Sequence, residues 1–144
     1  MTVLRVAAVQ ASYVLMDRDA TIDRVAALTA SAAREGAQLV VFPEVFVPGT
    51  PLWIDTQPIW DGDEEWFGLL ARNAVVIGGP ACDRLAAVAA EHGVWLVVGV
   101  DEREAHGATI YNTVLGPWLE GGNTVLVAPD GSCWRARSAS ARKP

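Results

Sequence analysis

Hydrophobic residues near the start of the chain alternate between short continuous runs and helical spacing. Leu4–Gln10 and Gln38–Phe42 are apolar runs with little polar alternation, and this pattern predicts two strands buried on both faces. The segment between them, Ala20–Glu35, has apolar or small residues at the spacing of one helix face: Ile22, Val25, Thr29 and Ala32. Asp19 or Thr21 can cap the start of this predicted helix, and Gly36 suits a left-handed stop.

A second unit with the same order follows. Gly79 and Pro80 suit a helix start, Gly93 suits its end, and Val94–Val100 is another apolar run. The apolar stripe of the predicted helix consists of Leu85, Val88 and Ala89. Strands that alternate with helices predict an α/β fold in which the helices pack on a sheet.

The pattern changes after Asp101, where no helical period is found. Ile110–Leu115 and Val125–Val127 are short strand-like runs, and Pro129–Gly131 predicts a tight turn. From residue 132 onward the sequence is polar, small and basic, which predicts a disordered tail. We therefore expect one domain over residues 1–131 and a divergent tail over 132–144.

The tetrapeptide NTVL occurs at Asn112–Leu115 and again at Asn123–Leu126. A tandem duplication of eleven residues explains the repeat, and coincidence between two valine-rich runs explains it equally well. Eleven residues are too few for a structural repeat unit, so the repeat predicts no solenoid.

Composition narrows the classes of partner. The chain has 144 residues, enough for one ordinary domain, and 51% of them are hydrophobic, with a mean hydropathy of +0.24. The net charge of −6 disfavours binding to nucleic acid or to an anionic membrane, and a small molecule or a protein is the expected partner. The N-terminal apolar run is too short for a signal peptide or a spanning helix, so we expect a cytoplasmic protein.

Neither the cysteines nor the acidic residues indicate a metal site. Cys82 and Cys133 form no CxxC pattern, and both are expected to be free thiols. The acidic run DGDEE at 61–65 lacks the spacing of a calcium loop and is expected to be a solvated loop. No glycine-rich phosphate-binding pattern follows a predicted strand, so we expect no nucleotide cofactor and no metal.

One carboxylate has an unusual setting. Glu44 follows a predicted buried strand and is surrounded by apolar residues in the segment VVFPEVFVPGTPLW at 40–53. The carboxyl ends of strands in open α/β sheets border ligand crevices, and partial burial there raises a carboxyl pKa toward the range of a general base. A structural role, such as capping a helix or pairing with an arginine, is the alternative from chemistry alone.

The segment FPEVFVPGTPLW resembles the glutamate motif of the nitrilase branch of the carbon-nitrogen hydrolases. The segments VAAVQAS, AAREGAQLVVFPE, GPACDRLAAVAAEHGVWLVVGVDERE, TIYNT and APDG resemble that family in the same order. The resemblance implies the N-terminal half of an α-β-β-α sandwich, a nitrile or amide substrate, no metal or other cofactor, and homo-oligomers of the complete enzyme. It also implies that Glu44 is the general base of a glutamate, lysine and cysteine set, in which the cysteine is the nucleophile.

Thr50 and Trp53 lie on the loop that helps to line the substrate pocket in the family, and the resemblance assigns them to substrate binding. The family often has an aromatic residue at the position of Thr50, so a different pocket size is expected. Packing of the loop against the core is the other reading of Trp53, because its large side chain serves either role.

The other two members of the catalytic set have no clear match. Lys143 is the only lysine and stands beside a terminal proline, and Cys133 with Trp134 follows the predicted turn without the strand and acidic neighbour of the family motif. The expectation is a chain that stops before the nucleophile and is inactive alone, as a fragment, a frameshift product or a truncation. Three functions stay open: a nitrilase-like hydrolase or related amidase, an inactive homologue that associates with full-length subunits, and a small α/β ligand-binding domain.

Overall fold

A computed structural model describes residues 3–56, 63–107, 109–115, 124–127, 129–131 and 133–136. Its centre is one six-stranded sheet in which the strands follow one another in sequence order. Strands β1, β2 and β3 are parallel to one another. Strand β4 runs antiparallel to β3, β5 runs parallel to β4, and β6 runs antiparallel to β5. The bounds are β1 Val6–Ala8, β2 Leu39–Val41, β3 Trp95–Arg103, β4 Ile110–Leu115, β5 Thr124–Val127 and β6 Cys133–Ala136.

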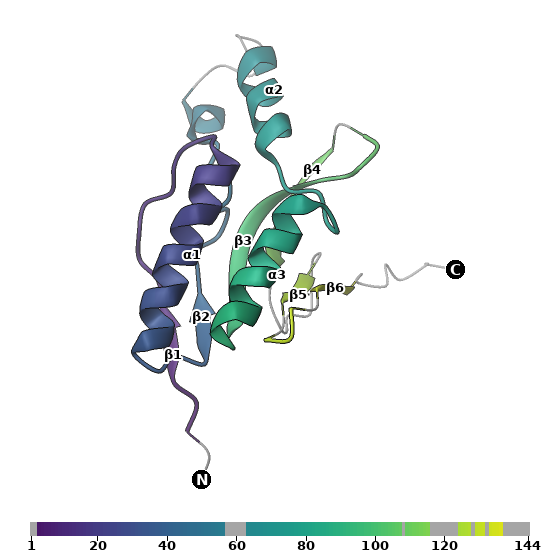
Figure 1. Ribbon diagram of the computed structural model, residues 1–144. Coiled ribbons are helices and arrows are strands. Elements are labelled where there is room, and N and C mark those ends of the chain that lie inside the picture. The colour runs from purple at the N-terminus through teal and green to yellow at the C-terminus, as the bar shows by residue number, and fades with distance from the viewer. Residues whose placement is uncertain are drawn as a thin grey trace, which may run out of the picture.

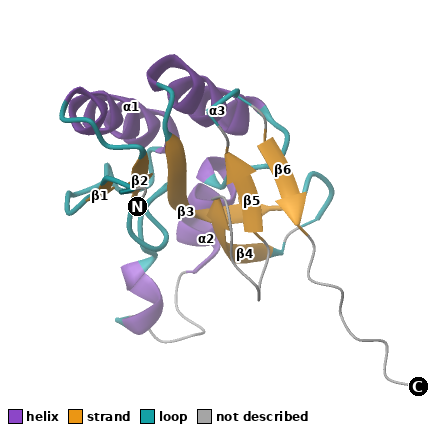
Figure 2. Ribbon diagram, turned by 90° about the horizontal axis from the view of Figure 1, so that it is seen from below, coloured by secondary structure: helices purple, strands orange, loops and turns teal. Residues whose placement is uncertain are grey.

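The helices connect the parallel strands, and two of them cover one side of the sheet. The bounds are α1 Arg18–Arg34, α2 Asp63–Asn73 and α3 Pro80–His92, with a short 3₁₀ helix η1 at Leu52–Asp55. Figure 1 shows α1 and α3 side by side in front of the sheet, and Figure 2 shows both on the same side of β1, β2 and β3. The architecture is therefore α/β, as the alternation of strand and helix patterns predicted.

Helix α1 begins earlier than the sequence suggested. Asp17, not Asp19 or Thr21, is the N-cap, and its carboxylate accepts a hydrogen bond of 2.9 Å from the backbone N–H of Ala20. The hydroxyl of Thr21 instead bonds both the N–H and the carbonyl of Val14, at 3.0 Å each, and so ties the helix to the preceding loop. The predicted left-handed glycine after the helix is confirmed, since Gly36 has φ 86°.

Helix α3 matches its sequence signals closely. Pro80 occupies the first turn after the N-cap Gly79, and Gly93 ends the helix with φ 62°. The predicted stripe is buried: Leu85 and Ala89 are fully buried and Val88 is 8% exposed. This stripe joins α3 to the main core beneath it.

Alternate residues of the parallel strands face opposite sides of the sheet, and only one side is covered. Val40 and Leu96 belong to the main core under the helices. The next row in register consists of Val6, Leu39 and Trp95, of which Val6 is 50% exposed and Trp95 is 37% exposed. The expectation that the first strand is buried on both faces is wrong for this part of the chain, because the described helices cover only one face.

Three further segments differ from the sequence expectations. Residues 63–65 of the acidic run begin α2 and are not a loop, because the residues after them form a helix that packs through Leu70. Strand β3 continues beyond Val100 to Arg103, since β4 pairs with it over this length. Strand β6 lies inside the tail for which we expected disorder, because its backbone finds a partner in β5. Residues 137–144 lie outside the described part.

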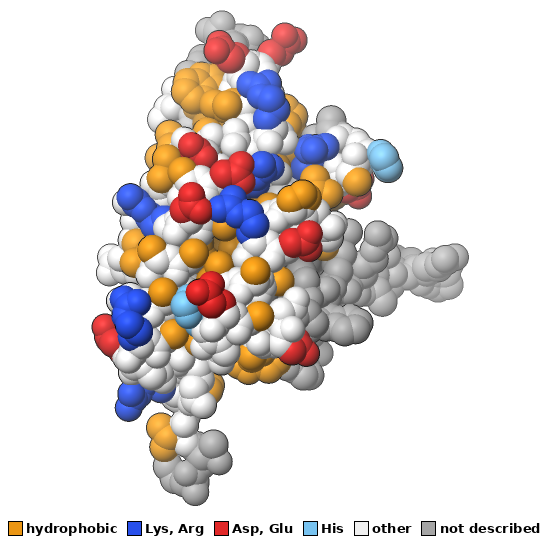
Figure 3. Space-filling view, viewed as in Figure 1, with side chains coloured by type: hydrophobic (Ala, Val, Ile, Leu, Met, Phe, Trp, Pro, Cys, Tyr) orange, Lys and Arg blue, Asp and Glu red, His pale blue; other side chains and the backbone are white. Residues whose placement is uncertain are grey.

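The outer surface over α1 and α3 mixes both signs of charge (Figure 3). Arg84 on α3 reaches across to Asp19 and Asp23 on α1, with N···O distances of 2.8 and 2.6 Å. In the view of Figure 3, this surface has no large patch of a single charge sign. The apolar residues of the two helices belong instead to the main core. Among the described residues, no helix is both long and apolar enough to cross a membrane.

Candidate active site

Glu44 lies on a turn between two points at which the chain is fixed to β3. Before the turn, the N–H of Phe42 donates to Val97 at 2.8 Å. After it, the N–H of Val47 donates to Gly99 at 3.1 Å, and the N–H of Asp101 donates back to Val47 at 2.8 Å. The chain therefore leaves β2, bulges at residues 43–46 and returns to the same neighbouring strand. This arrangement fixes the position of Glu44 at the carboxyl end of β2, where a ligand crevice is expected.

The bulge depends on close contact with a glycine and on an unusual backbone conformation. A Cβ on Gly99 would lie 2.5 Å from the carbonyl oxygen of Pro43 and 2.6 Å from the Cα of Glu44, so only glycine leaves room for the bulge. Val45 has φ 46°, in the left-handed region that β-branched residues rarely adopt, and it is buried. Backbone strain of this kind persists where the surrounding structure imposes it and is concentrated at functional sites.

The side chain of Glu44 is exposed and contacts one neighbouring strand. The amide Nδ2 of Asn112 on β4 donates a hydrogen bond to Oε1 of Glu44. The sequence led us to expect Glu44 to be partly buried, and this expectation is wrong for the described residues: its apolar neighbours Phe42, Val45 and Phe46 point into the core while Glu44 points out. Neither a helix cap nor an arginine pair is recorded for Glu44 in the part of the chain that the structure describes.

A pocket with a volume of about 340 Å³ opens beside this carboxylate. We call it the Glu44 pocket, and its lining residues are Glu44, Val45, Thr50, Pro51, Asp101 and Asn112. The structure thus brings together two residues of the predicted site, Glu44 and Thr50. It adds Asn112 and Asp101, which the sequence analysis did not select.

Asp101 and Asn112 reach the pocket through the pairing of β3 with β4. They are direct partners in the antiparallel register, so their side chains emerge on the same face of the sheet. Asp101 is only 5% exposed, and burial raises the pKa of its carboxyl group from 3.8 to about 7. A carboxylate within an apolar strand run and an asparagine in the following strand were the available sequence signals, but only the register shows that they meet.

Trp53 lies in a second, smaller cluster with Met16 and Leu70 and is 9% exposed. Its ring stacks on Trp66 of α2 at a centroid distance of 5.7 Å. Trp53 is absent from the lining of the Glu44 pocket, and its recorded contacts are those of a packing residue. Of the two readings of Trp53 from the sequence, these contacts match the packing of the loop.

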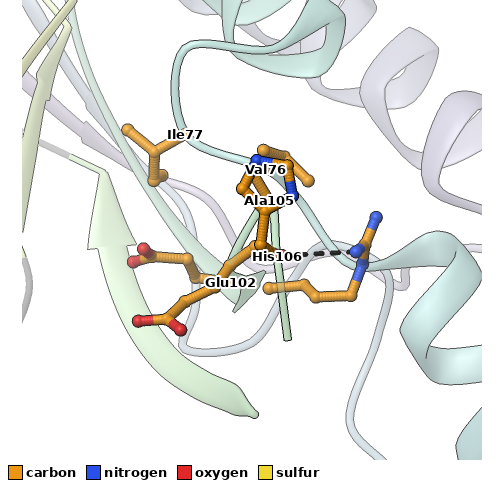
Figure 4. A pocket seen from close by; sticks show the side chains of 7 residues that line it. Val76, Ile77, Glu102, Ala105 and His106 are labelled. Carbon is orange, nitrogen blue, oxygen red and sulfur yellow. Dashed lines mark hydrogen bonds between the residues drawn. The ribbon is translucent and has the colours of Figure 1, made fainter. Parts of the chain in front are cut away.

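A second pocket, of about 280 Å³, lies at the carboxyl end of β3 and the residues that follow it (Figure 4). Glu102, Glu104 and His106 line it together with Val76 and Ile77. Glu102 is 1% exposed and accepts a hydrogen bond of 2.9 Å from the hydroxyl of Thr113. No group of three or more metal-ligating side chains that could hold an ion is found among the described residues.

The other candidate residues are not brought to the Glu44 pocket in the described part. Cys82 is buried at the start of α3, and its Sγ lies 3.6 Å from the carbonyl oxygen of Val76. Only the backbone of Cys133 is described, as the first residue of β6, and Lys143 lies outside the described residues.

Comparison with known proteins supplies the family context. Residues 5–116 match the family model of the carbon-nitrogen hydrolases. The chain is 44% identical over 117 residues to a bifunctional nitrilase/nitrile hydratase of Nicotiana tabacum, a match that covers 78% of this chain and 33% of the relative. It is 39% identical over 113 residues to an aliphatic nitrilase of Rhodococcus rhodochrous, a match that covers 77% of this chain and 30% of the relative. The match thus spans about a third of the length of these relatives.

Solved structures share the fold at lower identity. A CN-hydrolase superfamily protein from Xanthomonas campestris aligns with a TM-score of 0.64 and 24% identity, covering 94% of this chain and 40% of that one. An amidase from Nesterenkonia sp. aligns with a TM-score of 0.54 and 21% identity, covering 90% of this chain and 40% of the amidase. These alignments confirm the predicted α/β fold of this superfamily.

Proposed function

Since the chain belongs to the carbon-nitrogen hydrolase family, we propose that it forms the Glu44-bearing part of a nitrilase-like enzyme. The proposed reaction converts a nitrile to a carboxylic acid and ammonia. The observation that carries the proposal is the placement of Glu44 on a bulge fixed at both ends to β3, beside a pocket large enough for a small ligand.

In this proposal Glu44 is the general base. A cysteine thiolate attacks the nitrile carbon, the glutamate moves protons to and from the reacting groups, and a lysine stabilises the charge that develops. The exposed position of Glu44 leaves its carboxylate accessible to a substrate, and the amide of Asn112 holds one of its oxygens. The cysteine and the lysine are not assigned to residues of this chain.

We assign Thr50 to the pocket wall, where its side chain lines the space beside Glu44. Direct binding of the substrate by Trp53 remains a prediction. Its packing with Met16 and Leu70 supports an indirect contribution, in which it fixes the loop that carries Thr50 and Pro51.

The names of the relatives favour a nitrile over an amide as the substrate. The relatives at 39–44% identity are nitrilases, whereas the amidase from Nesterenkonia sp. is 21% identical. An amidase of the same superfamily remains the second candidate for the reaction. We propose a nitrile or amide, without a metal or other cofactor, and a homo-oligomer for the complete enzyme. The cytoplasmic location also stays a prediction.

We further propose that residues 1–131 form the hydrolase part and that the 144-residue chain is inactive alone. The open face of the sheet, with Val6 and Trp95 exposed, is where the second sheet of the sandwich packs in this proposal. If the chain exists as an inactive homologue, the same face supports association with full-length subunits.

A chimera tests the role of Glu44. Residues 1–131 would replace the matched region of the Rhodococcus aliphatic nitrilase, and ammonia release from an aliphatic nitrile would be measured after a circular dichroism check of folding. We expect release by the chimera and none by the 144-residue chain. Glu44→Gln should reduce the rate of the chimera by about 10²–10⁴-fold, the usual contribution of a general acid or base.

Glu35→Gln is the matched control, because Glu35 is also exposed but lies at the end of α1. Equal rates for the folded Glu44→Gln and Glu35→Gln chimeras would contradict the proposal. Co-expression of the chain with the full-length Rhodococcus enzyme tests the second candidate function. Co-purification of the two chains without any ammonia release by the chimera would favour the associating homologue.

A further inference from the structure

Asp101 is a buried acid with an unused hydrogen-bonding position. The residue is 5% exposed, and its Oδ2 has no hydrogen-bond partner in the described part of the structure. Buried polar side-chain atoms are bonded in the large majority of cases, and an unbonded one in a native fold calls for an explanation. Oδ2 itself is enclosed by the protein. Because Asp101 also lines the Glu44 pocket, a molecule bound in that pocket is in a position to pair with the carboxyl group of Asp101.

The groups around Asp101 favour a cationic donor. The Glu44 pocket contains two carboxyl groups, and none of its lining residues is basic. The amide of Asn112 is directed to Glu44. On the same strand, Arg103 donates to the carbonyl oxygens of Ala71 and Glu104 at 3.0 and 3.2 Å, so its charge is held elsewhere.

Within the described ranges, the other elements packed against Asp101 bring no further charge to it. The segment at Val75 contributes a backbone N–H that donates to the carbonyl of Asp101 at 2.7 Å. The side chain of Glu102 points to the other face of the sheet, where it accepts a hydrogen bond from the hydroxyl of Thr113. Glu44 is thus the titratable side chain that shares a pocket with Asp101 in the described residues.

We propose that Asp101 is a specificity-determining residue of the Glu44 pocket, and that it selects nitriles or amides that carry a protonated amine near the reacting group. The amine pairs with the carboxyl group of Asp101 in the pocket wall, while the C–N group lies beside Glu44. A pocket of about 340 Å³ is at the small end of the range for ligand sites, which suits a short aliphatic substrate. This inference rests on the proposed function for its reacting group, and its test is independent of turnover.

The test compares two nitriles of the same length. In 4-aminobutyronitrile a protonated amine replaces the terminal methyl group of pentanenitrile, so the pair differs mainly in charge and hydrogen bonding. Binding of each to the full 144-residue chain at pH 7.5 is followed by shifts of the backbone amide resonances in two-dimensional NMR. We expect the amine to bind at least tenfold more tightly and to shift the resonances of Val45, Asp101 and Asn112.

Asp101→Asn keeps the size of the side chain and removes its negative charge. It should reduce the preference for the amine to less than about twofold, whereas Asp83→Asn, on the exposed surface of α3, should leave the tenfold preference unchanged. Equal affinity of the wild-type chain for the two nitriles would overturn the proposal. An unchanged preference in Asp101→Asn would also overturn it, because the selectivity would then come from other groups.

A measurement on the wild-type chain keeps the proposal testable if Asp101→Asn does not fold. The carboxyl carbon of Asp101 is titrated by NMR with and without each nitrile. Bound 4-aminobutyronitrile should lower the pKa of Asp101, because a nearby cation favours the ionised form, and pentanenitrile should not. The absence of any difference between the two ligands overturns the proposal.

The chimera separates this inference from the proposed function. Loss of ammonia release in Glu44→Gln tests the reaction, and the ratio of the two nitrile affinities tests Asp101. A chain that prefers the amine but supports no turnover in the chimera would contradict the nitrilase proposal and keep the cation site. Turnover by the chimera without any preference for the amine would support the nitrilase proposal and contradict the cation site.

Discussion

The backbone of Glu44 rests directly on Gly99 of β3: a Cβ at position 99 would lie 2.6 Å from the Cα of Glu44. The same added atom would lie 2.5 Å from the N of Val45. Such distances are far below an ordinary contact, and the atoms involved are backbone atoms that cannot rotate away. The position of the candidate base therefore depends on the absence of a side chain on the neighbouring strand.

Gly99→Ala should displace the bulge that carries Glu44. Overpacking a close contact of this kind typically costs about 1–3 kcal/mol, and we expect a loss of that size in the free energy of unfolding. Thermal or urea unfolding measures the loss, and the amide resonances of residues 44–47 report the displacement.

Gly68→Ala is the matched control for this substitution. Gly68 lies inside α2, and an added Cβ there meets only the flexible guanidinium of Arg72, at 3.3 Å. Alanine in a helix interior is more stable than glycine by roughly 0.5–1 kcal/mol, so this variant should unfold at a slightly higher temperature. If both variants behave alike, the contact between Gly99 and Glu44 does not hold the bulge.

Asp101 should make the stability of the fold depend on pH. Its pKa is about 7 in the fold and 3.8 in its ordinary state, so the folded chain binds its proton more tightly than the unfolded chain does. Below about pH 4 this group does not lower the free energy of unfolding. The free energy of unfolding then falls as the pH rises toward 7, and it stays at the lower value above pH 7. The loss is up to about 4 kcal/mol, since each pKa unit corresponds to about 1.4 kcal/mol.

Asp101→Asn removes this loss, and urea unfolding at pH 4 and pH 8 measures it. The variant should gain stability relative to wild type at pH 8 and show little gain at pH 4. Glu91→Gln, which changes an exposed carboxylate near the end of α3, should show no such difference between the two pH values. If the free energy of unfolding changes with pH in the same way for wild type and Asp101→Asn, the raised pKa of Asp101 is contradicted.

Trp53→Ala should destabilise the fold more than Trp66→Ala. Trp53 is 9% exposed and packs with Met16 and Leu70, whereas Trp66 is 39% exposed and contributes mainly one face of a stacked pair. Removing a buried large aromatic side chain typically costs about 3–5 kcal/mol, and removing a partly exposed one costs less. Thermal unfolding compares the two. Equal losses would show that the cluster around Trp53 contributes little to stability.

The ion pairs between α1 and α3 should contribute little. Asp19 and Asp23 are 60% and 76% exposed, and Arg84 is 40% exposed. Exposed pairs of this kind are worth about 0.2–1 kcal/mol each and are screened by salt. Arg84→Ala should therefore lower stability by no more than about 1–2 kcal/mol, and the difference should shrink at high salt. A larger loss that is insensitive to salt would indicate that the stem of Arg84 acts through packing.

The pKa of Asp19 provides a separate check on the same surface. Hydrogen bonding from Arg18 is the largest influence and lowers the pKa of the Asp19 carboxyl, and Arg84 lowers it further. The group thus favours its ionised form in the fold. Arg84→Ala should raise the pKa of Asp19 only in part, since Arg18 remains, and an NMR titration of the carboxyl carbon measures the change.

The sequence by itself determined helices α1 and α3 and the family. Helical spacing at Ile22, Val25 and Thr29 and the Gly79–Pro80 start of α3 were sufficient to predict two helices, because these signals depend on neighbouring residues alone. The setting of Glu44 after an apolar strand was also visible, and the ordered motifs around it led to the carbon-nitrogen hydrolases.

Only the tertiary structure decided which side chains share the pocket with Glu44. Asn112 and Asp101 are distant from Glu44 in sequence, and the register of β3 and β4 brings them to it. The exposure of Glu44 on its bulge and the packing of Trp53 with Met16 and Leu70 were likewise decided by contacts between separate segments. Periodicity assigns residues to faces, but strand register and the coverage of each face arise from contacts between segments far apart in the chain, which no local pattern encodes.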